Sequence, residues 1–245
     1  MDWTKAKTII MVALALTILF LLFTYGIEKI EPETDEEILQ EETLKLLEKK
    51  NIFLNGQLPQ EHDRMAVLNV EYDVLDPDIL ESCMSRQKGM SSDQRKAEDA
   101  VEYTKEFLDD CGIYDKNVVL KSVSKDGSAY IIEYQNRVKG YALEESYMIC
   151  TVQDGKVVSL DRFWLDPVDF GKNKKVTLSA SAALVNFMMQ REGQEEMYIS
   201  HMEMVYWLDT ETVTGETPLS DTAFPAWKIV YNGGSISYIK AYESE

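Results

Sequence analysis

The chain has 245 residues, of which 45% are apolar and 28% are charged, a composition typical of globular proteins. It carries 43 Asp and Glu residues against 25 Lys and Arg residues, for a formal net charge of -18. This charge disfavours electrostatic binding to nucleic acid or to anionic lipid, so nucleic acid is not expected as a partner. The three cysteines, Cys83, Cys111 and Cys150, are too few for a disulfide scaffold, although one pair is possible in an oxidising compartment.

An apolar segment near the N-terminus has the length of a transmembrane helix. Thr8–Ile27 holds 20 residues without a charge, about 30 Å of helix. It is longer than the apolar region of a cleaved signal peptide and is not followed by an A-x-A-like cleavage site, so an uncleaved signal-anchor is the preferred interpretation. Lys5 and Lys7 precede it, which predicts a cytoplasmic N-terminus and an extracytoplasmic remainder in the cell membrane.

Small residues in this segment share one helical face. Ala6, Ala13, Thr17 and Thr24 are separated by seven, four and seven positions. Small and hydroxylated residues let transmembrane helices approach closely, so Ala13, Thr17 and Thr24 are the predicted contact face for another membrane protein. Chance in a segment rich in Ala and Thr is an equally good explanation.

Two helices and several strands are expected after the span. Thr34 and Glu37 form a capping box that opens a helix to about Lys50. Apolar residues at helical spacing predict a second helix between Ser91 and Gly112. Strands, some joined by Asp-Gly turns, are expected at Met65–Asp73, Asn117–Val123, Ser128–Val138, Glu145–Val152 and Lys156–Leu165.

The order of helix and strands then recurs. Thr177 is expected to cap a helix that runs to Met189, and strands follow at Met197–Leu208, Ala226–Asn232 and Ser235–Tyr242. The predicted fold class is α+β, with one transmembrane helix followed by two extracytoplasmic helix-plus-antiparallel-sheet units. The expected divisions are a cytoplasmic N-terminus at 1–7, the span at 8–27, a juxtamembrane helix and connector at 28–90, and α+β units at 91–165 and 166–245.

The sequence offers little to support catalysis. His201 and Glu203 alternate onto one face of an expected strand, a spacing that a metal pair can use, but no motif supplies further ligands. A partly exposed strand histidine beside a carboxylate is the preferred interpretation. The chain has no nucleophile elbow, phosphate-binding loop or dinucleotide fingerprint. We therefore expect no catalytic, cofactor-binding or metal-binding residues, no cofactor, and no enzymatic activity.

The two ends of the chain together resemble a known family. The opening MDWTKAKTI, followed at once by the apolar span, resembles the start of the YycI (WalI) proteins of Gram-positive bacteria. The closing PAWKIVYNGGSISYIKAYESE resembles the C-terminus of that family, and the stretch NIFLNGQLP and the helix at Leu178–Met189 are consistent with it.

The resemblance implies a membrane-anchored accessory regulator of the WalK/WalR (YycG/YycF) two-component system, which controls cell-wall metabolism. Its implied partners are a sensor histidine kinase of the WalK type and a YycH-like sister protein, with regulation largely through transmembrane helices. The family offers no catalytic residues to assign. Two alternatives remain open: an extracytoplasmic module that binds a peptide, wall fragment or cation, and a membrane-tethered hydrolase.

Overall fold

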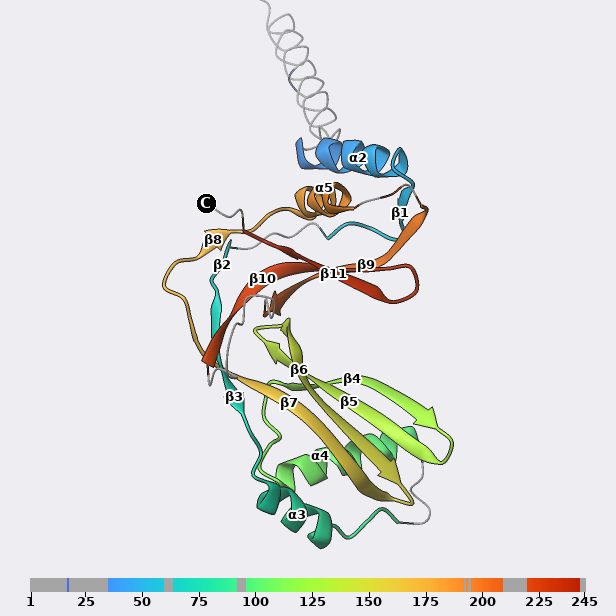
Figure 1. Cartoon of the computed structure of the whole chain (residues 1–245), viewed down its shortest axis with the longest axis vertical. Helices are drawn as coiled ribbons and strands as arrows, with labels where there is room; N and C mark the ends of the chain where they lie inside the picture. The colour runs from blue at the N-terminus through green and yellow to red at the C-terminus, as the bar shows by residue number, and fades with distance from the viewer. Residues whose placement is uncertain are drawn as a thin grey trace, which may run out of the picture.

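The computed structural model describes residues 17, 35–59, 64–91, 96–191, 193, 195–208 and 220–242. In this part of the chain the fold is α+β, with helices packed on a large, mostly antiparallel sheet of nine strands. The molecule has two lobes, joined by β3 and β7 (Figure 1). We name each lobe after the helix that covers its sheet.

The α4 lobe is a strongly twisted antiparallel sheet with helices on one face. Its strands follow one another along the chain, so each pairs with its neighbour through a hairpin, and the short turns at Asp126–Gly127 and Asp154–Gly155 hold positive φ angles. Asp76 caps the first helix by accepting a hydrogen bond from the Asp78 backbone amide. The elements of the lobe are α3 (Pro77–Arg86), α4 (Ala97–Asp110), β4 (Val118–Asp126), β5 (Ala129–Val138), β6 (Tyr141–Gln153) and β7 (Lys156–Phe170).

The α5 lobe is built from both ends of the described chain. An N-terminal helix and short strand pack with the C-terminal strands, and the first strand, β1, pairs in parallel with β9. Figure 1 shows both helices of the lobe on the same face of β9, β10 and β11. The elements of the lobe are α2 (Asp35–Glu48), β1 (Ile52–Leu54), α5 (Ala180–Gln190), β9 (Met197–Trp207), β10 (Ser220–Tyr231) and β11 (Ser235–Lys240), and the remaining strands are β2 (Arg64–Met65), β3 (Leu68–Asp73) and β8 (Lys175–Val176).

Five strands close into a ring where the lobes meet. β9 pairs with β10, β10 with β3, β3 with β7, and β7 with β6. The ring is completed by a short parallel pairing of β6 with β9, at Ala142 opposite Val205 and Leu143 opposite Tyr206. A separate apolar cluster is associated with these strands and includes Leu68, Val70, Leu143, Leu165 and Tyr206.

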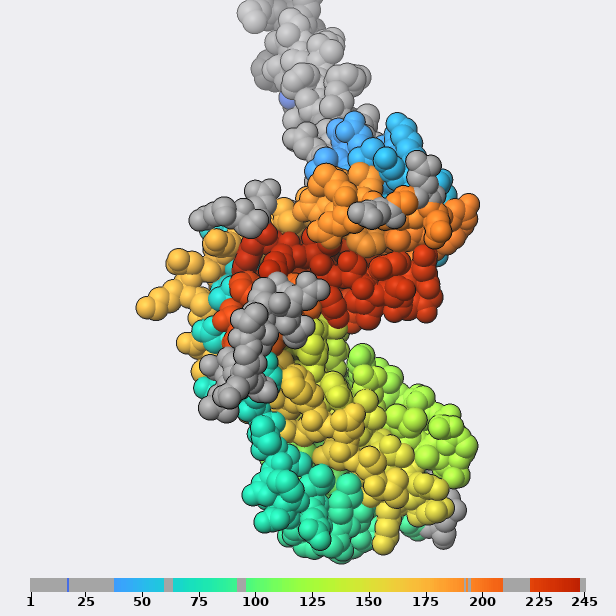
Figure 2. Space-filling view, in the orientation of Figure 1, coloured from blue at the N-terminus to red at the C-terminus, as the bar shows by residue number. Residues whose placement is uncertain are grey.

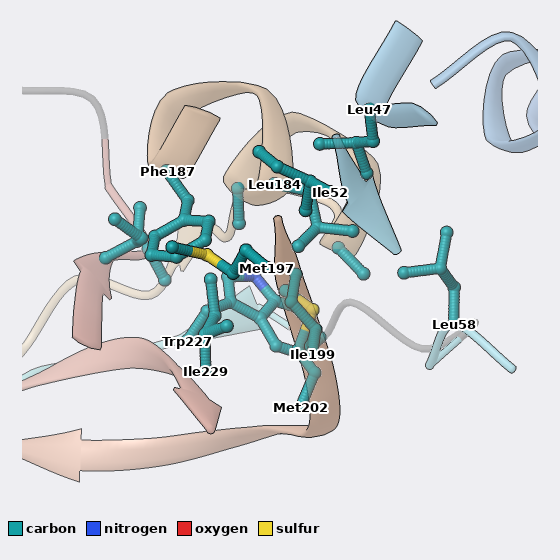
Figure 3. Close-up of a cluster of buried hydrophobic side chains, with 14 residues drawn as sticks. Leu47, Ile52, Leu58, Leu184, Phe187, Met197, Ile199, Met202, Trp227 and Ile229 are labelled. Atoms are coloured by element: carbon teal, nitrogen blue, oxygen red, sulfur yellow. The ribbon is translucent and has the colours of Figure 1, made fainter. Parts of the chain in front are cut away.

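Each lobe also has its own hydrophobic core. In the α5 lobe the buried Trp227 lies between β10 and α5, facing Leu184 and Phe187, while Leu47 of α2 closes the cluster from above (Figure 3). The Trp227 indole Nε1 donates a 2.8 Å hydrogen bond to the Leu178 carbonyl, which ties the sheet to the chain entering α5. In the α4 lobe, the cluster between α4 and the sheet includes Phe107, Leu108, Ile132, Tyr134 and Trp164.

The structure confirms the strongest periodic predictions. The helix expected from Thr34 is present as α2, and Gly112 has the positive φ of 71° expected of a residue that ends α4. The strands expected in the α4 lobe and at the C-terminus are all present, several of them longer than expected. The single strand expected at Met65–Asp73 is instead two strands, β2 and β3, because Ala66 and Val67 pair with neither sheet.

Two helix starts differ from expectation. α4 begins at Ala97 rather than at Ser91, and the Asp99 carboxylate accepts a hydrogen bond from the Lys96 backbone amide at its first turn. α5 begins at Ala180, and its cap is Ser179, whose hydroxyl accepts a hydrogen bond from the Ala182 amide, rather than Thr177. The sequence analysis also missed α3, although Asp76 followed by Pro77 is a recognisable helix start.

The predicted anchor lies outside the described residues, except for Thr17, which is helical and exposed. Among the described residues no helix is both long enough and apolar enough to cross a bilayer. The division into units at 91–165 and 166–245 remains a prediction, and the residues proposed for their boundary include the end of β7.

Candidate functional site

The two lobes meet at a corner in β6. Glu144–Ser146 lie opposite no residue of β5, because Gln135 pairs with Tyr147 whereas the next residue, Asn136, pairs with Leu143. On the N-terminal side of this bulge β6 pairs with β9, and on its C-terminal side it pairs with β7. The bulge therefore transfers β6 from one lobe to the other.

Side chains form hydrogen bonds with the backbone groups that the bulge leaves unpaired. The Leu165 amide of β7 donates to the Ser146 hydroxyl at 3.1 Å, and the Leu165 carbonyl accepts a 2.8 Å hydrogen bond from the Asn136 amide group. Both side chains are buried. Because unpaired backbone groups are costly in the interior, these polar residues stabilise a corner that strand pairing alone would leave incomplete.

The Glu144 carboxylate links the lobes through a buried ion pair. Lys228 Nζ of β10 lies 2.9 and 3.0 Å from its two oxygens. The Tyr238 hydroxyl of β11 donates to Glu144 Oε2 at 2.8 Å, and burial together with this bond raises the pKa of Tyr238, so the phenol stays protonated. The Gln135 side-chain amide approaches Glu144 Oε1 at 3.4 Å. Three strands of the sheet thus converge on one carboxylate.

The neighbouring Glu145 has an unusual environment. Its φ of 62° is in the left-handed region, which is uncommon for a residue other than glycine. Burial raises the pKa of Glu145 to about 7, and the adjacent Glu144 charge acts in the same direction. The hydrogen bond that its carboxylate accepts from the Leu208 amide opposes the shift. Glu145 therefore changes charge near neutral pH at the point where the lobes join.

A second, more exposed layer of charge surrounds Glu203 of β9. Its carboxylate lies 3.7 Å from Arg137 Nη2, 3.7 Å from His201 Nε2 and 4.0 Å from Lys228 Nζ. These distances are longer than the 2.7–2.9 Å of a charge-assisted hydrogen bond. The Glu203 side chain is 30% exposed, so it lies at the edge of the interior.

These residues line a pocket between the lobes. The pocket has a volume of about 370 Å³ and combines residues of β4 and β5 with residues of β9 and β10. Figure 2 shows the surface hollowed between the red and orange part of the α5 lobe and the green and yellow α4 lobe. Its lining residues are Val119, Leu120, Lys121, Gln135, Arg137, His201, Glu203 and Lys228.

A larger hollow of about 570 Å³ lies between α3 and α4. The polar group at its centre is already satisfied: the Gln87 side chain exchanges hydrogen bonds with both backbone groups of Val157 and accepts one from the Tyr103 hydroxyl. The hollow is lined by four carboxylates of α4 and by only two basic residues of the preceding segment. We regard it as a structural junction.

Some residues identified in the sequence lie at the interlobe pocket and others do not. His201 and Glu203 are on one face of β9, as expected, and Lys228 and Arg137 join them there. No group of three or more potential metal ligands occurs among the described residues. Cys83, Cys111 and Cys150 are free and buried in the α4 lobe. Ala13 and Thr24 of the proposed transmembrane face lie outside the described residues.

Sequence reasoning missed the centre of this site. Glu144 and Lys228 are 84 positions apart, and no local pattern connects them. One signal was available: Lys228 interrupts the otherwise apolar strand Ala226–Tyr231, and a lysine in a buried strand requires an acidic partner.

Comparison with known proteins establishes the family. A family model described as YycI protein matches residues 33–242. The chain belongs to the YycI family. The match covers both lobes and the ring between them, and it begins after the predicted anchor. No curated protein matches the chain.

The YycI family is a family of accessory proteins associated with the WalK/WalR (YycG/YycF) two-component system, and it is not a known enzyme family. The matched family is the one that the two ends of the chain resemble. Because the match spans the α4 lobe, it extends the family assignment to the central part of the chain, where the sequence alone carried no specific motif.

Proposed function

We propose that this protein is a membrane-anchored accessory regulator of a WalK-type sensor histidine kinase that controls cell-wall metabolism. Membership of the YycI family over residues 33–242 is the observation that carries the proposal. A YycH-like sister protein is the proposed second partner. The proposal assigns the protein no catalytic step.

The proposed location is the cell membrane, with one span, a cytoplasmic N-terminus and both lobes outside the cell. The uncharged segment Thr8–Ile27 supports it, because its length suits the hydrocarbon core of a bilayer. Lys5 and Lys7, before the segment, favour retention of the N-terminus in the cytoplasm.

In this proposal the span acts by packing against a transmembrane helix of the kinase. A helix without charged residues influences a partner only through the difference in packing free energy between the two states of that partner. Ala13, Thr17 and Thr24 form the proposed contact face, because their small side chains allow a close approach.

Co-purification in mild detergent tests this proposal. The intact protein, expressed with a WalK-type kinase, should recover the kinase, whereas replacement of Thr8–Ile27 by an unrelated span should abolish recovery. A double substitution, Ala13→Leu with Thr17→Leu, should weaken recovery about tenfold, as expected when close helix packing is lost. Ala15→Leu is the matched control, since position 15 faces away from Ala13 on a helix.

Equal recovery with the replaced span would contradict the role of the helix and place the contact in the lobes. Equal recovery with the double substitution and with Ala15→Leu would contradict only the assigned face.

A second candidate function is an extracytoplasmic binding module, and the pocket between the lobes favours it. In that case the anchor only tethers the lobes. Regulation in cells would then survive replacement of the span but not closure of the pocket by a bulky residue such as Leu120→Trp, at a lining position that is 40% exposed, whereas the first proposal requires the reverse result.

A further inference from the structure

We propose that an exposed face of α2 docks a basic amphipathic helix in the membrane-proximal, extracytoplasmic part of a second membrane protein. The face consists of Ile38, Leu39, Glu42 and Leu46. This inference rests on the proposed membrane location, and it adds a contact outside the bilayer to the contact proposed for the span.

The helix has more apolar surface than its packing in the α5 lobe uses. Leu47 is 1% exposed and Leu44 packs against the same core, so one side of α2 faces α5 and the sheet. Ile38, Leu39 and Leu46 remain 42%, 50% and 39% exposed. By contrast, α3 and α5 each have a single exposed large apolar residue. Three of the five large aliphatic side chains of α2 are therefore available to a partner.

The three exposed side chains share one side of the helix. At about 100° per residue, Ile38, Leu46 and Leu39 fall within an arc of roughly 100°, which is the width of the apolar stripe of an amphipathic helix. Glu42 lies near the middle of this arc. The face extends over about 12 Å along the axis, so roughly two turns of a partner helix cover it.

The charge of α2 indicates a basic partner. Six of its fourteen residues are Asp or Glu, and its single basic residue, Lys45, pairs with Glu41 at 2.8 Å beside the face. Glu42 has no ion pair or hydrogen bond within the described part of the chain. A Lys or Arg among the apolar contact residues of a partner helix pairs with Glu42 while the surrounding apolar side chains cover Leu39 and Leu46.

The same charge disfavours two other occupants. Helices that lie on an anionic lipid surface carry Lys and Arg on their polar face, whereas α2 is acidic. In a symmetric dimer through this face, the acidic residues of one α2 would lie against those of the second, and Glu42 would approach its own copy. A partner of opposite charge avoids both penalties.

The predicted anchor keeps α2 close to the membrane. The uncharged segment ends at Ile27 and α2 begins at Asp35, so the eight steps between them reach at most about 28 Å. A protein anchored in the same membrane presents its membrane-proximal helices at this height and at a high effective concentration. The position of α2 therefore favours a membrane protein as the partner.

Fluorescence anisotropy with the full-length protein in nanodiscs of zwitterionic phosphatidylcholine tests the inference. The probe is a labelled peptide of leucine and lysine, as long as α2, with its leucines at helical spacing, and empty nanodiscs give the lipid background. One control peptide has glutamate in place of every lysine, and the other alternates leucine and lysine at the same composition. The probe should bind, and both controls should bind at least about tenfold more weakly, because the first lacks the opposite charge and the second lacks a helical apolar face.

Removal of the apolar side chains tests the assigned face. Leu39→Ser with Leu46→Ser should weaken binding of the probe about tenfold or more, because the two leucines supply much of the apolar area of the face. The matched control is Val158→Ser with Val168→Ser, at two β7 positions that are each 54% exposed. This control should leave the affinity unchanged.

Reversal of one charge tests the role of Glu42. Glu42→Lys should weaken binding about three- to tenfold, because it places like charges together. Glu48→Lys makes the same change in net charge about 120° around the helix and should change the affinity less than about twofold. A thermal melt of each variant identifies any loss of fold.

Equal binding of the lysine and glutamate peptides would overturn the basic character of the partner, and equal binding of the alternating peptide would overturn its helical character. Unchanged affinity in Leu39→Ser with Leu46→Ser would overturn the assigned face. If sedimentation showed a dimer that this double variant dissociates, the face would belong to a second copy and the inference would be wrong.

The outcomes also separate this inference from the proposed function. Failure of the protein to insert into nanodiscs would contradict the proposed anchor and this inference with it. Insertion without binding of the probe would contradict this inference alone. No kinase is present in these measurements, so they do not depend on the result of co-purification.

Discussion

Lys228 and Glu144 form an ion pair that is almost fully removed from solvent, with side chains 9% and 8% exposed. They come from β10 and β6, so the pair joins the α5 lobe to the corner where β6 changes lobes. Buried ion pairs contribute little net stability, but loss of one partner leaves the other charge unpaired in the interior. The cost of removing one partner is therefore expected to exceed the net contribution of the intact pair.

We expect Lys228→Met to lower the free energy of unfolding by about 3–5 kcal/mol, because it leaves the Glu144 carboxylate buried without its cation. The double variant Lys228→Met with Glu144→Leu should recover much of this loss. Urea unfolding measures the free energy of unfolding of both variants. Lys121→Met is the control, since the Lys121–Glu133 pair is exposed and should cost less than about 1 kcal/mol. An equal cost for Lys228→Met and Lys121→Met would contradict the burial argument.

The raised pKa of Glu145 predicts a dependence of stability on pH. The folded state holds a proton on this carboxyl up to a pKa of about 7, whereas the unfolded chain releases it near the ordinary value of 4.5. Between these values the folded state binds more protons, so the contribution of Glu145 to stability falls as the pH rises from 4.5 to 7. Urea unfolding across this range should show a smaller decline for Glu145→Gln than for the unchanged protein. If the free energy of unfolding declined equally with pH in both proteins, the raised pKa of Glu145 would be refuted.

Two of the three cysteines, Cys111 and Cys150, should be inert in the folded protein. Burial raises the pKa of Cys150 to about 12, and it also raises the pKa of Cys111, so neither forms the reactive thiolate near neutral pH. We expect a maleimide reagent at pH 7.5 to leave both unmodified until denaturant is added, when all three thiols react. Mass spectrometry of each peptide gives the result. Rapid modification of Cys150 in the native protein would indicate that the α4 lobe opens readily.

Trp227 should be important for the α5 lobe. Trp227→Phe removes the hydrogen bond to the Leu178 carbonyl and leaves space beside α5, so we expect a loss of about 1–3 kcal/mol. Trp207→Phe is a matched control, because Trp207 is stacked on Tyr238 at the partly exposed end of β9. In thermal unfolding, the melting temperature of Trp227→Phe should be well below that of Trp207→Phe. The reverse order would mean that the Leu178 bond contributes little.

Local patterns predicted most of the elements of this fold. The helical spacing of apolar residues found α4, and Asp-Gly pairs located the hairpins of the α4 lobe, because both signals depend on neighbours within a few positions. The three-residue strand β1 was missed, since its strand partner is β9, some 145 positions away. Short strands with remote partners leave no periodic signal.

The site was less predictable than the fold. The spacing of His201 and Glu203 correctly indicated a shared strand face, but the partners of Glu203 come from β5 and β10. The bulge at Glu144–Ser146 was not predicted, because three consecutive polar residues without a glycine do not distinguish a bulge from the start of a strand. The partner that a strand loses or gains at a bulge depends on the arrangement of the whole sheet. The pattern of residues in one segment carries no information about that arrangement.

The chain order of the two lobes has a consequence for biosynthesis. The α4 lobe is built from one continuous stretch, whereas α2 and β1 must wait for α5 and β9, which are translated far later. Contacts between distant segments form slowly, and strands without partners are prone to aggregate until they do. A chain that stops before Ala180 therefore has all the elements of the α4 lobe, while Leu47 and Ile52 of its N-terminal segment still lack the residues that bury them.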